Sequence, residues 1–274
     1  MKESEPVDRD RLGVITGALL LALALSRLLQ MPARPLNLES LGLHMVLSVS
    51  SGALTAGIIA GMAIAGMTSL VHSHPRARQE PIDHTLMYAL MPTLWACALA
   101  FALPQLQNPF LWVAALLAGG VVFALILALE YAAVERQPKR SLSWQWAYMA
   151  CIHLTALAVL TIIYAQRAPS LVASLLVWLG MTLLATRFYW SNAGKLTEAA
   201  IYGAIVGILM AQMAWAINYW RLSNLQGGLL LFVCFYVLAG LIQQQRLHRL
   251  SRQIVVEYGV AAVLATLFAL LILP

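Results

Sequence analysis

Apolar windows of about 20 residues recur along almost the whole chain, with short polar breaks between them. A helix of about 20 apolar residues is long enough to cross the roughly 30 Å hydrocarbon core of a bilayer. Hydropathy places nine such windows, at residues 12–31, 43–71, 85–103, 110–134, 143–165, 170–190, 197–219, 227–244 and 254–273. The sequence therefore predicts an all-α fold, a polytopic transmembrane helical bundle of about nine spans.

The composition agrees with a membrane protein and leaves no room for a soluble domain. Of the 274 residues, 61% are hydrophobic and 10% are charged, whereas soluble domains are about 25% charged. The longest polar segments are far shorter than the roughly 50 residues of an independent domain. The N-terminal tail is too acidic for a signal peptide, so we expect a cytoplasmic tail over 1–11 and a single transmembrane domain over 12–274.

The distribution of Lys and Arg predicts the orientation of the spans. If the chain crosses the membrane once at each window, 13 of the 17 basic residues fall on the same side as the N-terminus and 4 fall on the other side. Cytoplasmic loops carry an excess of Lys and Arg. We therefore expect a cytoplasmic N-terminus and a C-terminus on the outside.

Aromatic residues gather at both predicted membrane surfaces, as Trp and Tyr do at interfaces. Under this orientation Trp215, Tyr219 and Trp220 fall at the outer surface. Tyr189 and Trp190 fall at the inner surface. The sequence predicts two aromatic belts.

Several classes of function find no support in the sequence. The net charge of +6 is spread over every break, so no basic face for nucleic acid is expected. No window contains a lysine, and neither a nucleotide-binding loop nor a hydrolase or metalloprotease motif is present. Cys97, Cys151 and Cys234 lie inside apolar windows and predict no disulfide framework. We predict no cofactor, and catalysis is unsupported although not excluded.

Four charged residues lie at the predicted inner ends of windows: Glu130, Arg187, Glu198 and Glu257. A charged group inside a span is costly and is therefore a candidate for function. These four groups could converge on a polar pocket near the inner leaflet, in which Arg187 pairs with a carboxylate. Alternatively, each could reach water separately by extending its side chain to the interface.

A polar stripe is predicted along the window at 197–219. Glu198, Tyr202, Gln212 and Tyr219 lie near one face of a helix with 3.6 residues per turn. Such a stripe could line a substrate path, or it could be the polar side that the helix buries against its neighbours.

Histidines provide the remaining candidate ligands. His153 lies deep inside a window and could ligate a cofactor or pass a proton, or it could be a neutral histidine bonded to a neighbouring helix. His72, His74, Asp83 and His84 share one inner loop, but their spacing matches no standard zinc site. We predict no metal site.

Small residues recur every fourth position in two windows, at Ala53, Gly57, Gly61 and Ala65 and at Ala199, Gly203, Gly207 and Ala211. In lipid, small residues at this spacing let helix backbones approach closely. The two faces could pack within the chain, or they could bind a second copy or other membrane subunits.

From "AWAINYW" to "EYG", Ala214 to Gly259, the chain resembles a group of polytopic bacterial membrane proteins whose domain is of unknown function. The resemblance implies a bacterial plasma membrane and brings no activity.

Three hypotheses for function follow, and membrane lipids are partners in all of them. The first is a carrier that does not use ATP, or a lipid-handling protein, with a polar site near the inner leaflet. The second is an accessory or scaffold subunit of a larger membrane complex. The third is an enzyme that modifies lipid at the interface.

Overall fold

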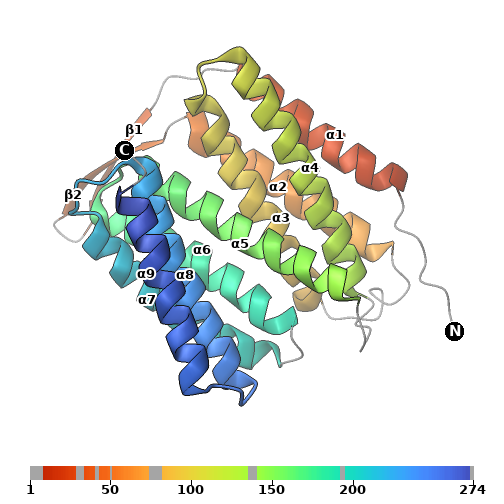
Figure 1. Cartoon of the computed structure of the whole chain (residues 1–274). Coiled ribbons are helices and arrows are strands. Elements are labelled where there is room, and N and C mark those ends of the chain that lie inside the picture. The colour runs from red at the N-terminus through yellow and green to blue at the C-terminus, as the bar shows by residue number, and fades with distance from the viewer. Residues whose placement is uncertain are drawn as a thin grey trace, which may run out of the picture. The chain divides into compact units, whose positions relative to one another are not determined.

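The computed structural model describes residues 9–28, 34–40, 43–49, 51–73, 82–134, 141–191 and 195–271 (Figure 1). Nine α-helices lie within these residues and confirm the predicted all-α class. They are α1 (Arg9–Ser26), α2 (Ser51–His72), α3 (Ile82–Ala102), α4 (Pro109–Val134), α5 (Leu142–Ala165), α6 (Ser170–Ser191), α7 (Leu196–Ile217), α8 (Asn224–Arg246) and α9 (Arg252–Leu271). A short 3-10 helix, η2 (Leu103–Gln105), follows α3.

Eight of these helices, α2 to α9, are long and apolar enough to cross a membrane. The chain is therefore a multi-pass integral membrane protein. The remaining helix, α1, has 18 residues and begins with three charged residues, Arg9, Asp10 and Arg11. The orientation of the termini remains a prediction.

A hairpin corrects the predicted start of the second window. Strands β1 (Arg34–Ser40) and β2 (Leu43–Val49) pair antiparallel, from Arg34 opposite Val49 to Ser40 opposite Leu43. The window expected at 43–71 is therefore a strand followed by a 22-residue helix that begins at Ser51. The physical reason is visible in the sequence, because apolar residues occupy every second position from Leu43 to Val49, and this is the period of a strand.

The chain divides into two compact units, Met1–Trp144 and Gln145–Pro274, and the boundary in the sequence falls near the start of α5. Each unit is described by itself. The single transmembrane domain that the sequence led us to expect remains a prediction.

In the first unit, side-chain contacts join α4 to α3 and to the end of α1. Arg27, just after α1, lies over the ring of Trp112 near the start of α4, 4.7 Å from its centroid. The indole of Trp95 in α3 donates a hydrogen bond of 2.9 Å to the carbonyl of Gly119 in α4. These contacts fix α1, α3 and α4 to one another.

In the second unit, the small-residue face of α7 packs closely against α6. A Cβ atom on Gly203 would lie 2.8 Å from the Thr182 carbonyl oxygen, and one on Gly207 would lie 2.8 Å from the Trp178 carbonyl oxygen. Both glycines are therefore needed for the approach of the two backbones. By contrast, no atom of another described segment lies within 4 Å of such a Cβ on Gly57.

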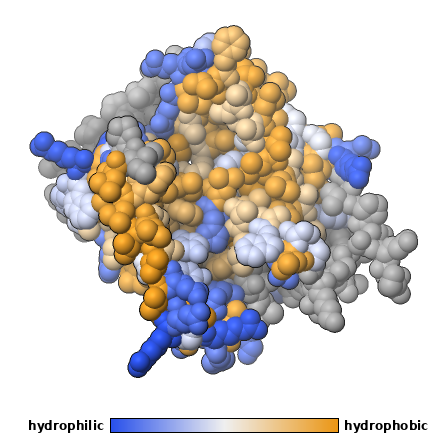
Figure 2. All heavy atoms as spheres, in the orientation of Figure 1, coloured by the Kyte–Doolittle hydropathy of each residue, from blue (hydrophilic) through white to orange (hydrophobic). Residues whose placement is uncertain are grey.

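Hydrophobic residues cover most of the helix surface that Figure 2 shows, and hydrophilic residues gather where α8 and α9 meet. Among the residues assigned to α9, only Ala269 is buried. Large apolar side chains on this helix are exposed, such as Val263 at 60% and Leu264 at 62%. An apolar surface of this extent is typical of a protein surrounded by lipid.

Candidate functional site

One end of the second unit gathers two arginines and several aromatic rings. At this end α6 stops at Ser191, α7 begins at Leu196, α8 stops at Arg246 and α9 begins at Arg252. We call it the arginine end. Three of the predicted site residues besides Arg187 belong to the same helix ends: Glu198, Tyr202 and Glu257.

Arg246 makes contacts with two aromatic rings and one carbonyl at the arginine end. Its guanidinium lies 5.2 Å from the ring centroids of both Tyr189 and Tyr202. Its Nη1 donates a hydrogen bond of 3.1 Å to the Tyr189 carbonyl. The Tyr189 hydroxyl in turn donates to the Ala239 carbonyl at 3.2 Å. This network joins α6, α7 and α8 through one half-buried cation.

Arg187 is fully buried in the same unit, with 0% of its side chain exposed. Its guanidinium lies 5.2 Å from the ring of Trp190 and 5.5 Å from the ring of Tyr148. Guanidinium groups stack favourably on aromatic faces, most strongly where water is excluded. Two aromatic rings therefore lie close to this charge, and the expected pairing of Arg187 with a carboxylate remains a prediction.

The three predicted carboxylates lie in different surroundings. Glu198 and Glu257 are exposed at the arginine end, and Glu257 accepts a hydrogen bond of 3.1 Å from Gln253. Glu130 is fully buried near the end of α4, in the first unit. A pocket that joins Glu130 to Arg187 would combine residues of both units, so it remains a prediction.

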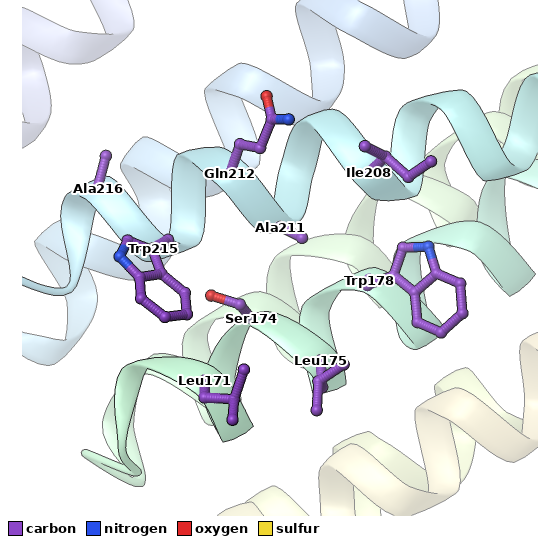
Figure 3. A pocket seen from close by; sticks show the side chains of 9 residues that line it. All are labelled: Leu171, Ser174, Leu175, Trp178, Ile208, Ala211, Gln212, Trp215 and Ala216. Atoms are coloured by element: carbon purple, nitrogen blue, oxygen red, sulfur yellow. The ribbon is translucent and has the colours of Figure 1, made fainter.

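The polar stripe on α7 divides between two settings. Tyr202 packs by its edge against Tyr189, with ring centroids 6.1 Å apart. Gln212 is exposed, and it lines a groove of about 410 Å³ between α6 and α7 near the other end of the unit (Figure 3). Tyr219, beyond the end of α7, is 69% exposed.

His153 lies within α5 among aromatic side chains of α6 and α8. Its Nδ1 donates a hydrogen bond of 2.8 Å to the Met149 carbonyl, so Nε2 carries the lone pair in the neutral ring. Four rings surround it edge-on at centroid distances of 5.6 to 6.5 Å: Phe188, Phe232, Phe235 and Tyr236. This tautomer keeps Nε2 available as a ligand atom, but a ligand role remains a prediction.

Within the part of the chain that the structure describes, no three His, Cys, Asp or Glu side chains group closely enough to hold a metal ion. His74, a member of the histidine loop, lies outside the described residues.

Sequence reasoning missed two central residues of the arginine end, Arg246 and Tyr189. The predicted window ends at residue 244, which places Arg246 in the loop that follows. In the structure α8 continues to Arg246. Tyr189 and Trp190 were assigned to an aromatic belt, but their side chains are 0% and 8% exposed. They serve helix packing instead.

The arginine end is chemically suited to hold an anion. Arg246 has no described hydrogen bond other than the one to Tyr189, so within the described residues its other N–H groups have no acceptor. Lys195, Arg249 and Arg252 lie at the same helix ends and are exposed. Planar guanidinium groups bind phosphate and carboxylate through paired hydrogen bonds.

A family model with the description "Protein of unknown function (DUF5656)" matches residues 31–272. The chain belongs to this family. The match extends the resemblance noted at Ala214–Gly259 to most of the chain. No curated protein and no solved structure gave a significant match. Membership of the DUF5656 family brings no activity to the chain, so its function has to be argued from its own residues.

Proposed function

We propose that the chain is a carrier that does not use ATP, or a lipid-handling protein, and that its polar site is the arginine end. Among these two, lipid handling has the stronger support. The chemical task of the site is to bind the anionic headgroup of a membrane lipid. The proposed location is the inner leaflet of a bacterial plasma membrane, under the orientation that the Lys and Arg distribution predicts.

The observation that carries this proposal is the arrangement of Arg246. Its guanidinium lies against two tyrosine rings, 5.2 Å from each centroid, and is anchored by one hydrogen bond. A cation fixed in this way loses little conformational freedom when it binds a ligand. The N–H groups that the described residues leave open can then form a pair of hydrogen bonds to one phosphate.

The surroundings of Arg246 favour a lipid over a soluble substrate. Lys195, Arg249 and Arg252 are exposed at the helix ends, where phosphate groups of a bilayer lie. Each Lys or Arg near an anionic membrane surface contributes about 1 kcal/mol of attraction. Glu198 and Glu257 at the same end would repel an anion and could restrict where the headgroup sits.

Lipid translocation in proteoliposomes tests the proposal. Phosphatidylglycerol with a fluorescent label on its acyl chain is distributed over both leaflets, and dithionite destroys the label that reaches the outer leaflet. We expect the protein to speed the loss of protected label. We expect Arg246→Gln to slow that loss by at least about tenfold, because it removes a charge-assisted hydrogen bond worth roughly 1.5–3 kcal/mol.

Arg221→Gln is the matched control, because it removes the same charge from an exposed side chain beyond the other end of α7, which has no hydrogen bond or ring contact with the described residues. It should keep most of the activity. Equal rates for the two variants would show that only net charge matters. An inactive wild-type protein would exclude lipid translocation.

A scaffold role is the second candidate, and the open face of α2 favours it. Gly57 and Gly61 are exposed, and within the described residues no atom lies within 4 Å of a Cβ built on either one. The corresponding face of α7 packs against α6 through Gly203 and Gly207. We propose that any homodimer or complex with other membrane subunits forms through the α2 face. Purification of a stable complex of fixed stoichiometry, lost on Gly61→Leu, would support the scaffold.

A further inference from the structure

The groove between α6 and α7 lies away from the arginine end and has a different chemistry. It has a volume of about 410 Å³ and is lined by Leu171, Ser174, Leu175, Trp178, Ile208, Ala211, Gln212, Trp215 and Ala216. This volume falls within the range of about 300–1,000 Å³ that is usual for small-molecule sites. None of the lining residues is charged. A free anion is therefore a poor occupant.

The shape of the groove follows from the sizes of its residues. Figure 3 shows Trp178 and Trp215 at opposite ends, and small residues, Ser174 and Ala211, between them where the two helices face each other. The rim is open, since Leu175 is 52% exposed and Ile208 is 50% exposed. A flexible hydrocarbon chain can enter a groove of this kind through its open rim and lie along it.

Two polar groups in the groove have no partner among the described residues. Ser174 is buried, with 7% of its side chain exposed, and its Oγ makes no hydrogen bond there. The amide of Gln212 is exposed and likewise has no described hydrogen bond. Below the headgroups of a bilayer water is scarce, so an unpaired hydroxyl or amide there is costly. A ligand atom that accepts hydrogen bonds would remove this cost.

Both polar groups lie at the same depth. Gln212 is five residues before the end of α7, and Ser174 is four residues after the start of α6, so each is about 6–8 Å from its helix end. The two ends are adjacent, because Asn218 donates a hydrogen bond of 2.8 Å to the Ser170 hydroxyl. This depth, just inside the interface, is where the ester groups of a glycerolipid lie.

We propose that the groove binds one acyl chain of a glycerolipid, with the ester carbonyl as acceptor for the Ser174 hydroxyl and the Gln212 amide. The chain lies over Ala211 and packs against Trp178. Under the predicted orientation the lipid belongs to the outer leaflet. The site is independent of the arginine end, because it recognises the neutral ester region and not the headgroup charge.

Native mass spectrometry of the purified full-length chain in detergent tests the proposal. The probes are dioleoylphosphatidylcholine and its diether analogue, which has the same headgroup and chains but lacks both carbonyls. We expect the wild-type protein to retain the ester lipid about three to ten times more strongly, as expected for one or two hydrogen bonds. Ser174→Ala and Gln212→Leu should reduce that ratio.

Filling the groove tests the position of the lipid. Ala211→Leu should weaken the retention of both lipids, and Ala200→Leu, on an exposed part of α7 outside the groove, should not. Ala216→Leu fills the groove from an exposed position, so it serves if Ala211→Leu fails to fold. Circular dichroism during heating checks that each variant is folded.

Three results would overturn the proposal. The first is equal retention of the ester and ether lipids by the wild-type protein. The second is unchanged retention in both filled variants. The third is displacement of the ester lipid by an equal concentration of menaquinone-4, which would assign the groove to a quinone. Because both probes have a zwitterionic headgroup, none of these results bears on the arginine end.

Discussion

At the residue scale, Tyr189 connects three helices of the second unit. Its hydroxyl donates to the Ala239 carbonyl of α8, and its ring contacts the edge of Tyr202 of α7. Its own carbonyl accepts from Arg246. The sequence could indicate that the inner ends of these helices carry charges and tyrosines. It could not indicate which rings face inward, because that depends on the rotation of each helix about its axis.

We predict that Tyr189→Phe lowers the free energy of unfolding by about 0.6 kcal/mol, and at most about 1.7 kcal/mol, the range measured for hydrogen bonds between transmembrane helices. Only the bond to Ala239 is lost, since the ring remains. Unfolding in mixed micelles with increasing SDS measures this value. Tyr219→Phe is the control. Because Tyr219 is 69% exposed, this substitution should leave the free energy of unfolding unchanged. Equal effects for the two variants would contradict the role of the Tyr189 hydroxyl.

At the scale of elements, hydropathy predicted most of the helices to within a few residues, because lipid demands long apolar segments. It failed at residues 43–49, where apolar residues at every second position form a strand. It also could not separate the two small-residue faces, since Gly57 and Gly203 have the same spacing to the next glycine. Only the folded chain shows that α7 uses its face against α6, whereas no other described residue comes within 4 Å of a Cβ built on Gly57 or Gly61 of α2.

We predict that Gly207→Ala destabilises the protein by about 1–3 kcal/mol, the usual cost of overpacking. The added Cβ would lie 2.8 Å from the Trp178 carbonyl oxygen, and a backbone atom cannot move aside easily. Gly57→Ala is the matched control, and it should be neutral or stabilising because the added Cβ meets no atom of another described segment within 4 Å. Thermal unfolding of the two variants side by side measures the difference. A Gly207→Ala protein as stable as Gly57→Ala would show that α6 and α7 are not packed this closely.

At the scale of the whole molecule, the role of α1 decides the topology. Leu19 and Leu23 of α1 are buried, although α1 is less apolar than the other eight helices. If α1 spans the membrane with the others, nine spans place the two termini on opposite sides. If α1 lies at the surface, eight spans place them on the same side.

We predict a cytoplasmic N-terminus and an external C-terminus, because this arrangement places 13 of the 17 basic residues inside. Single cysteines introduced at either terminus of a cysteine-free variant can be labelled in intact cells with a membrane-impermeant maleimide. The C-terminal cysteine should react without lysis, and the N-terminal cysteine only after lysis. Labelling of both termini, or of neither, in intact cells would support eight spans.

Lipid selectivity of the arginine end is the most direct test of the proposed function. Native mass spectrometry should show that the wild-type protein retains phosphatidylglycerol more strongly than phosphatidylcholine. We predict that both Arg246→Gln and Arg246→Lys lose most of this preference, because lysine keeps the charge but not the planar pair of donors. Arg221→Gln, at the other end of the second unit, should keep most of it. A preference that survives in Arg246→Gln, or is absent from the wild-type protein, would contradict an anionic-lipid site at Arg246.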